Sequence, residues 1–386
     1  MLYRPEAFDR LTDTPWDEAR VRERIRDIVA DTDAAWRGPK LFWKAHEWDR
    51  WNMTSPMKNL YVGSAGVLWA LDQLRRRGYA ETSLPVVDLA VHNLELFRAK
   101  PDYMKIPAFE PPEPRDSALF MGEAGILLVA WRLGNREYVD DLRRRLLANV
   151  DNEAEEVFWG APGSLIAAAA IGDESLWKKL ADELLKRRAE NGLWTQRLYR
   201  EEYQSLTPPH GLVGNVQALL AALDAGRAAA LKKETAAILA ESAHRENGFA
   251  NWPPRPRPHL PGPDGQIRLQ WCAGAPGIVV ATADYLDEEL LVAGADLIWH
   301  AGPHGDEKGP SICHGTAGNG YALLRTFART EDEIWLERAR RFVMHALEQV
   351  ERMPPRYSLF TGGLGVAIFA ADCIEASPRY PVMQYV

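Results

Sequence analysis

Three side chains with metal-binding chemistry stand directly before glycine-rich turns of the sequence. Cys272 occurs in WCAGAPG, and Cys313 is followed by His314 in ICHGTAG. Two thiolates and one imidazole form a Cys2His donor set for zinc, which leaves the fourth tetrahedral position open to water or substrate. An open position is typical of a catalytic site, and zinc would deprotonate both thiols at neutral pH. We therefore predict one catalytic Zn2+ per chain, able to hold a substrate thiol as its thiolate.

Two further side chains could take part in acid/base chemistry near the same turns. His210 directly precedes a glycine turn in PHGLVG, and Glu156 lies four residues before Gly160 in EEVFWG. An imidazole can give and regain a proton at neutral pH, so His210 is our candidate acid/base residue, and Glu156 could orient it. Each has a structural alternative. His210 could be a helix cap or a hydrogen-bonded core histidine, and Glu156 a solvated first-turn carboxylate.

The other candidates also have plain structural explanations. A lone buried cysteine is more often a small core hydrophobe than a ligand, and Cys373, beyond the last glycine pattern, is expected in the core. Lys308 and Arg356 stand shortly before glycine patterns, in DEKGPSICHG and MPPRYSLFTGG. They are candidate substrate-binding cations, although most such residues are surface charge. The adjacency of Cys313 and His314 at a repeated turn makes a metal site as good an interpretation as a core thiol.

One pattern, Gly-x-x-Gly followed by an apolar run, recurs seven times and defines the predicted fold. The runs after the glycines are apolar or small on nearly all sides, whereas stretches between them, such as SLWKKLADELLKRRAENG, have one apolar face. Glycine permits unusual backbone angles and close approach of neighbouring elements. We predict an all-α fold, an α/α toroid of seven helix pairs with the glycine turns at one end of its inner ring. The first glycines of the patterns are Gly63, Gly122, Gly160, Gly211, Gly274, Gly315 and Gly362.

The repeats also predict how the chain is organised. We expect one domain over residues 1–386, with 1–59 as an N-terminal helical extension and 60–386 as the seven repeats. Two proline-rich stretches, 107–116 and 251–265, are expected to be loops, because proline lacks a backbone donor. The second stretch comes shortly before Cys272 and could shape a rim or lid of the shared cavity.

The composition restricts the function classes. The 386-residue chain carries a formal net charge of −8, with 46% apolar and 26% charged residues, which is the balance of a folded globular protein. A net negative charge argues against nucleic-acid binding, and no stretch approaches the roughly 20 apolar residues that cross a bilayer. The first residues lack the apolar core of a signal peptide, and three cysteines are too few for a disulfide framework. We expect a cytoplasmic protein with reduced thiols.

Four motifs resemble those of the lanthionine synthetase C-like family, zinc proteins with an α/α toroid of seven glycine-marked repeats. They are WCAGAPG, ICHGTAGNGYA, HGLVGN and SLFTGGLG, and the resemblance runs from about residue 60 to the C-terminus. It implies that Cys272, Cys313 and His314 are zinc ligands and that His210 is the acid/base residue. Where the peptide cyclases of the family have an aspartate, this chain has Glu156, which resembles the stand-alone and eukaryotic-type members instead.

The tail FAADCIEASPRYPVM also resembles those stand-alone members, some of which bind glutathione. By the same resemblance, Lys308 and, less directly, Arg356 would contact glutathione. The implied reaction is a zinc-dependent Michael-type addition of a thiol, glutathione first, to a dehydroalanine or dehydrobutyrine residue of a peptide or protein, which forms a thioether. A separate dehydratase or kinase would have to take part in making the dehydroamino acid.

Three other functions stay open from the sequence. The thiol could be a cysteine of the same peptide, which would make the protein a lanthipeptide cyclase that forms intramolecular (methyl)lanthionine. The protein could instead bind zinc and glutathione without turnover. Its 14 tryptophans and its acidic residues also fit a carbohydrate-active α/α toroid, which would need a pair of carboxylates at suitable separation.

Overall fold

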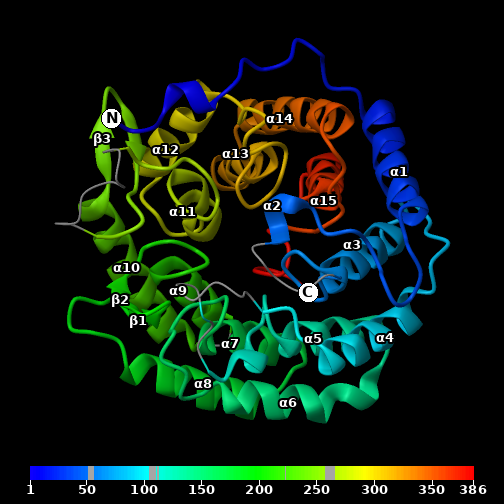
Figure 1. The fold of residues 1–386 in the computed structure, drawn as a ribbon. Coiled ribbons are helices and arrows are strands. Elements are labelled where there is room, and N and C mark those ends of the chain that lie inside the picture. The colour runs from blue at the N-terminus through cyan, green and yellow to red at the C-terminus, as the bar shows by residue number, and fades with distance from the viewer. Residues whose placement is uncertain (51–55, 104–109, 111–112, 222, 257–265) are drawn as a thin grey trace.

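The computed structural model describes residues 1–50, 56–103, 110, 113–221, 223–256 and 266–386. Two concentric layers of helices form a ring, with one inner helix after each glycine pattern (Figure 1). This confirms the predicted all-α α/α toroid. The inner helices are α3 (Ser64–Arg76), α5 (Glu123–Leu133), α7 (Ala161–Ala170), α9 (Leu212–Leu220), α11 (Ala275–Thr282), α13 (Thr316–Thr330) and α15 (Gly363–Ile374). The outer helices are α1 (Glu18–Ala34), α4 (Val86–Ala99), α6 (Val139–Ala148), α8 (Glu174–Lys186), α10 (Ala225–Ser242), α12 (Glu288–Ala301) and α14 (Glu333–Arg352).

The ring closes through contacts between the first and the last repeat. Each inner helix packs against the next, from α3 to α15, and α15 packs back onto α3. Helix α1 packs against α15 and supplies the outer helix of the last pair. The N-terminal extension predicted for residues 1–59 therefore contains a helix that belongs to the ring. The division of the chain into one domain stays a prediction.

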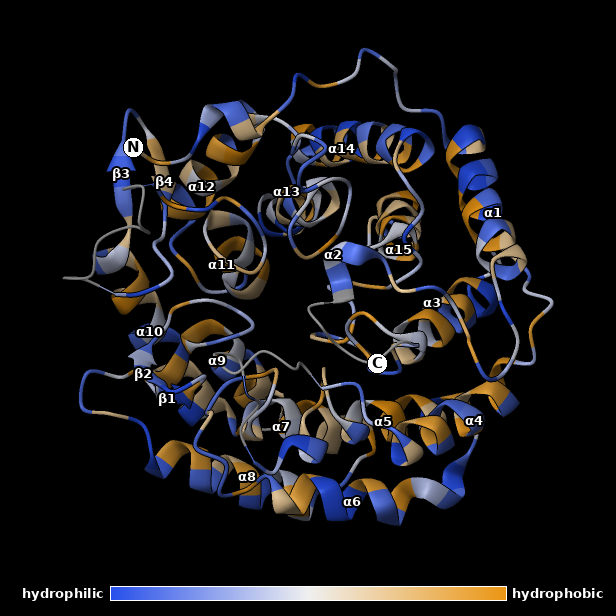
Figure 2. Cartoon of the chain, viewed as in Figure 1, coloured by the Kyte–Doolittle hydropathy of each residue, from blue (hydrophilic) through white to orange (hydrophobic). Residues whose placement is uncertain are grey.

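The two layers differ in burial, as the sequence pattern predicts. Every residue of α11 is buried, whereas α14 buries one face and presents charged side chains on the other. Figure 2 shows the same contrast as blue hydrophilic stretches along the outer helices. No helix in the described ranges is both long and apolar enough to cross a membrane. Five outer helices begin at an aspartate whose side chain accepts a hydrogen bond from a first-turn amide: Asp17, Asp173, Asp224, Asp287 and Asp332.

The second glycine of each pattern is required by close packing of the turn. A Cβ atom built on it would lie 1.8 to 2.4 Å from the carbonyl oxygen of the residue six positions earlier, in all seven repeats. For Gly277 that oxygen belongs to Trp271, at 1.9 Å. Unusual backbone angles, the other predicted reason for glycine, apply among the repeat glycines to Gly274 alone, with a φ of +111°. Close approach rather than a left-handed backbone therefore explains the repeat.

Two β-hairpins and four short helices complete the described structure. Strand β1 (Thr195–Leu198) pairs antiparallel with β2 (Glu201–Gln204), and β3 (His244–Glu246) pairs with β4 (Phe249–Asn251). The two-residue turn of the first hairpin places Tyr199 and Arg200 at φ of +57° and +63°, as in a type I′ turn. The short helices are η1 (Pro5–Ala7), α2 (Glu47–Arg50), η3 (Arg115–Ser117) and η4 (Arg136–Tyr138).

The proline-rich stretches lie partly outside the described residues. Positions 107–109, 111–112 and 257–265 are not described, so the lid role of the second stretch stays a prediction. Residues 252–256 are irregular, in line with the predicted loop. The loop prediction is wrong at one end of each stretch. The first stretch ends in η3, which begins at Arg115, and the second begins at Asn251, the last residue of β4.

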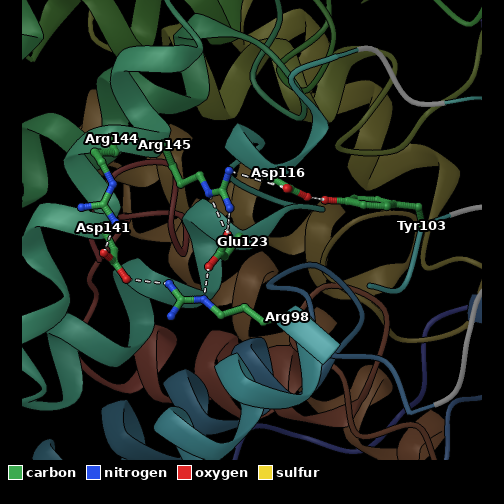
Figure 3. A network of polar contacts seen from close by, with 7 residues as sticks. All are labelled: Arg98, Tyr103, Asp116, Glu123, Asp141, Arg144 and Arg145. Carbon is green, nitrogen blue, oxygen red and sulfur yellow. Dashed lines mark hydrogen bonds and ion pairs between the residues drawn. The ribbon is translucent and has the colours of Figure 1, made fainter. Parts of the chain in front are cut away.

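A network of ion pairs links the outer helix of the first repeat, α4, to both helices of the second repeat (Figure 3). Glu123 begins α5 and is almost fully buried. Its carboxylate accepts from Nε of Arg98 on α4 at 2.5 Å and from Nε of Arg145 on α6 at 2.7 Å. Because both oxygens are paired, the charge of the buried carboxylate is compensated. The network also includes Tyr103, Asp116, Asp141 and Arg144.

The C-terminal tail supports the glycine turns from inside the ring. Tyr380 is fully buried, and its ring stacks on Trp271 with centroids 4.6 Å apart. Its hydroxyl donates to the carbonyl oxygen of Ile312 at 2.8 Å. Because Trp271 and Ile312 directly precede Cys272 and Cys313, the tail buttresses the backbone that carries both thiols.

Candidate metal centre and active site

The residues two positions before the first glycine of each repeat meet at one end of the ring. The amide of Cys272 donates to the carbonyl of Cys313 over 3.4 Å, and the amide of Cys313 donates to the carbonyl of Phe360 over 3.0 Å. Phe360 in turn donates to Tyr61 over 3.4 Å. Equivalent positions of separate repeats are thereby held side by side. The seven residues are Tyr61, Phe120, Phe158, Pro209, Cys272, Cys313 and Phe360.

An open cavity of about 1020 Å³ lies at this end of the ring. Cys272, Cys313, His314 and His210 all line it, so the structure brings together four of the predicted site residues. Next to them, Phe158 packs against the ring of His210 with centroids 5.2 Å apart. This volume is at the upper end of the range for small-molecule sites.

The three predicted metal ligands form a compact cluster. The ligand atoms of Cys272, Cys313 and His314 all lie within 4.8 Å of one another, and this is the one such cluster in the described part of the chain. Nδ1 of His314 lies 3.1 Å from Sγ of Cys272. Tetrahedral zinc with ordinary bond lengths sets its donor atoms about 3.5 to 3.8 Å apart. The donor set and its spacing therefore fit a zinc ion after small side-chain adjustments, and leave one coordination position for a substrate.

Two neighbouring side chains orient the cluster. The hydroxyl of Tyr61 lies 3.1 Å from both Sγ of Cys313 and Nε2 of His314, and Nε2 of Gln270 donates to Sγ of Cys272 at 2.9 Å. With Nε2 of His314 facing Tyr61, Nδ1 is the ring atom that faces Cys272. Such contacts fix the orientation of metal ligands and raise metal affinity.

The two thiols differ in acidity. The hydrogen bond from Cys313 lowers the pKa of Cys272, whereas burial raises the pKa of Cys313. Burial also raises the pKa of Tyr61, whose hydroxyl therefore stays protonated. Cys272 is thus the thiol that ionises first, and a cation bound beside it would favour its thiolate form.

His210 lines the same cavity as the three candidate ligands and forms a hydrogen-bonded pair with Glu156. Glu156 is fully buried, and its Oε2 lies 2.7 Å from Nδ1 of His210. The same carboxylate accepts from the backbone amides of Phe158 at 3.1 Å and Trp159 at 2.5 Å, so it is held rigidly. Because Nδ1 faces the carboxylate, Nε2 is left for chemistry in the cavity, and the side chain of His210 is 33% exposed. Glu156 does not itself line the cavity.

Lys308 and Arg356 are not among the described residues that line the cavity. Nζ of Lys308 lies 3.3 Å from a carboxylate oxygen of Glu307, and its side chain is half-buried. The guanidinium of Arg356 lies 5.2 Å over the ring of Trp48. Their assignment as substrate contacts stays a prediction.

The short helix α2, which precedes the first glycine pattern, packs against the candidate metal ligand His314. The ring of Trp48 lies 5.1 Å from that of His314. The next residue, Asp49, is buried, and burial raises its pKa. No motif in residues 1–59 indicates this contact. These residues contain no glycine pattern, so the repeat does not predict which part of the ring they contact.

Sequence reasoning also missed the wall of the cavity that the hairpin β1–β2 builds. Tyr199, Arg200 and Tyr203 of this hairpin line the cavity. Arg255, shortly after β4, and Arg268, four residues before Cys272, add two further guanidiniums. The hairpin interrupts the alternation of inner and outer helices, so the repeat does not predict that the hairpin faces the cavity.

The comparisons with known proteins agree with this fold. The sequence model of the lanthionine synthetase C-like protein family matches residues 43–384. A protein of zebrafish (Danio rerio) named glutathione S-transferase LANCL1 is 30% identical over 132 residues, which cover 31% of this chain and only 32% of that protein. Nisin cyclase has a similar structure, with a TM-score of 0.60 over 92% of this chain and 94% of the cyclase, at 16% sequence identity. Because the family match spans most of its residues, the chain belongs to the lanthionine synthetase C-like family.

Proposed function

We propose that the protein catalyses the zinc-dependent addition of a thiol, glutathione first, to dehydroalanine or dehydrobutyrine residues of peptides or proteins, which forms a thioether. The observation that carries this proposal is one cavity lined by both a Cys2His cluster and an imidazole backed by a buried carboxylate. Family membership and relatives named glutathione S-transferase and nisin cyclase support an enzyme rather than a scaffold.

The residues of the chain account for the proton transfers. Nε2 of His210 takes the proton of the thiol, and the sulfur attacks the β-carbon of the dehydroamino acid. The double-bond electrons move toward the carbonyl as an enolate, and His210 returns the proton to the α-carbon. Glu156 holds Nδ1 and stabilises the imidazolium between the two transfers. Zinc held by Cys272, Cys313 and His314 would act as a Lewis acid that stabilises the thiolate.

The attacking thiol could be glutathione or a cysteine of the acceptor peptide itself, and the structure of the site is compatible with both. A cysteine of the same peptide would make the protein a lanthipeptide cyclase, and the same proton transfers would serve. The presence of Glu156 rather than aspartate and the resemblance of the tail favour glutathione. In either case a separate dehydratase or kinase would have to help make the dehydroamino acid.

The structure does not favour a carbohydrate-active toroid. Such an enzyme needs two carboxylates across its substrate, and Glu201 is the one carboxylate among the described residues that line the cavity. A protein that binds zinc and glutathione without turnover would keep the metal cluster, but would not require the pair formed by His210 and Glu156. All three cysteines are free thiols, and we propose a cytoplasmic location, where thiols stay reduced.

The test is intact mass spectrometry of a dehydrobutyrine peptide that carries one cysteine, incubated with zinc-loaded protein with and without glutathione. A mass gain of one glutathione above the enzyme-free control supports the proposal. Loss of the alkylatable cysteine without a mass gain identifies a cyclase instead. If neither change occurs, the protein is a binder or uses another substrate.

The matched control compares two cysteine substitutions. Cys313→Ala removes a proposed ligand and should remove both zinc and activity. Cys373→Ala removes a buried thiol outside the cluster and should keep both. Full zinc content in Cys313→Ala would contradict the ligand assignment.

A further inference from the structure

The cavity has a basic and aromatic wall that the proposed chemistry does not use. Arg200 and Tyr203 come from the hairpin β1–β2, and Arg255 and Arg268 come from the segments on either side of residues 257–265. Glu201 is the one acidic residue among the described lining residues. The chain has a net charge of −8, whereas the cavity lining contains three arginines and one glutamate. The charge of the lining is therefore opposite in sign to that of the whole chain. This charge distribution suits an anionic group of a ligand.

The wall is a fixed part of the cavity. Nε1 of Trp159 donates to the hydroxyl of Tyr199 at 2.8 Å, which ties the hairpin to the turn that carries Glu156. Leu198, the last residue of β1, is buried. The two-residue turn then sets the position of Arg200. The hairpin therefore presents its tip at a defined place beside the acid/base pair.

Arg200 and Arg255 are positioned without using all their hydrogen-bond donors. The guanidinium of Arg255 lies 4.9 Å over the ring of Tyr203 and donates to Glu201 at 3.0 Å. Arg200 donates to Glu110 at 3.1 Å. A guanidinium has five N–H donors, so each can bind a second carboxylate in a bidentate manner. Exposed pairs such as these contribute little to stability, and a substrate carboxylate can displace them.

We propose that Arg200 and Arg255 form a carboxylate-binding subsite, so that the enzyme selects acidic substrates. This inference rests on the proposed thiol addition and adds its substrate class. The carboxylate belongs either to an acidic side chain next to the dehydroamino acid of the acceptor, or to glutathione. The chemistry of recognition is the same for both, namely a charge-assisted pair of hydrogen bonds in the cavity that His210 also lines.

The experiment compares two dehydrobutyrine peptides that differ only in Glu or Gln at the flanking positions. KM for each peptide and for glutathione is measured with the wild-type protein, Arg255→Gln and the double variant Arg200→Gln/Arg255→Gln. Arg197→Gln is the matched control, because Arg197 is on the same hairpin, pairs with Glu202 and does not line the cavity. We expect KM for the substrate that supplies the carboxylate to rise about threefold in the single and about tenfold in the double variant, and to stay unchanged in Arg197→Gln.

The two sources of the carboxylate give different results. If the acceptor supplies it, the wild-type protein prefers the Glu peptide, and the double variant loses this preference while KM for glutathione stays the same. If glutathione supplies it, KM for glutathione rises and the peptide preference does not change. An unchanged KM for all three substrates in the double variant would overturn the subsite.

A binding measurement separates this inference from the proposed reaction. Rhodamine-labelled Glu and Gln peptides, with alanine in place of dehydrobutyrine, are titrated with zinc-loaded protein and followed by fluorescence anisotropy. Tighter binding of the Glu peptide that is lost in the double variant supports the subsite even if no thioether ever forms. Glutathione is added as a competitor in the same titration. Equal binding of both peptides, with no displacement by glutathione, would overturn the subsite whatever the turnover assay shows.

Discussion

The hydrogen bonds around Glu156 predict a large effect of the substitution Glu156→Gln. Oε2 of Glu156 lies 2.7 Å from Nδ1 of His210 and accepts from the amide of Phe158 at 3.1 Å. Oε1 accepts from the amide of Trp159 at 2.5 Å. Each of these three donors faces an oxygen. Glutamine offers one oxygen and one NH2 group, so at least one donor must face another donor.

The magnitude follows from the loss of this buried, charge-assisted contact. Leaving a buried N–H group without an acceptor costs about 1 to 3 kcal/mol of folding free energy. In the proposed mechanism the imidazolium of His210 also loses its carboxylate during turnover, at a cost of about 2.7 kcal/mol in activation free energy, or about 100-fold in kcat. Zinc content and KM for glutathione should not change, because Glu156 contacts neither the metal cluster nor the cavity.

The assay is the rate of glutathione adduct formation by intact mass spectrometry at saturating zinc. Glu156→Asp keeps a carboxylate, and should retain more than about a tenth of the wild-type rate while Glu156→Gln does not. Glu202→Gln makes the same chemical change on the hairpin β1–β2, where Glu202 pairs with Arg197 and does not line the cavity, so it should leave kcat unchanged. A decrease below about threefold for Glu156→Gln, or a decrease no larger than that of Glu202→Gln, would refute the reasoning.

Three further predictions test the ligand surroundings and the fold. Tyr61→Phe removes the hydroxyl that contacts two of the proposed zinc ligands, Cys313 and His314. It should lower zinc affinity about tenfold in a chelator competition, at nearly unchanged melting temperature. Gly277→Ala places a Cβ atom 1.9 Å from a carbonyl oxygen, and should lower the free energy of unfolding in urea by about 3 kcal/mol or more. Gly226→Ala on outer helix α10 is the control. The nearest atom to its Cβ is 3.4 Å away, so it should be neutral or stabilising. Burial lowers the pKa of His304 to about 4. Between pH 6.5 and 4 the unfolded state therefore binds more protons than the folded state. Up to about 3 kcal/mol of the free energy of unfolding is lost as pH falls through this range. His304→Gln should flatten that part of the stability profile at saturating zinc, and an unchanged slope would contradict the assignment.

The ring and the cluster formed by Cys272, Cys313 and His314 could be predicted because they follow one local constraint. Each turn must bring its second glycine against the carbonyl oxygen six residues earlier, and no residue with a side chain fits there. The turns then hydrogen bond to one another, so residues at equivalent positions become neighbours. Cys272, Cys313 and His314 converge for this reason. Tyr61 could have been found in the same way, because it occupies the position that the two cysteines hold in other repeats.

Contacts between non-repeating segments could not be predicted. Trp48 reaches His314 and Tyr380 reaches Trp271 from the two ends of the chain, and no sequence period relates these residues. A position shortly before a glycine turn also does not fix the direction of a long side chain. Arg356 accordingly lies over Trp48 rather than along the cavity.

The most direct test of the central claim is X-ray absorption at the zinc edge of the purified protein, before and after glutathione is added. The account predicts two sulfur ligands at about 2.3 Å and one imidazole nitrogen at about 2.0 to 2.1 Å, with a light atom in the fourth position. Glutathione should replace that light atom by a third sulfur. A zinc shell without two sulfurs, or one that glutathione leaves unchanged, would contradict the claim that Cys272, Cys313 and His314 hold zinc for thiol addition.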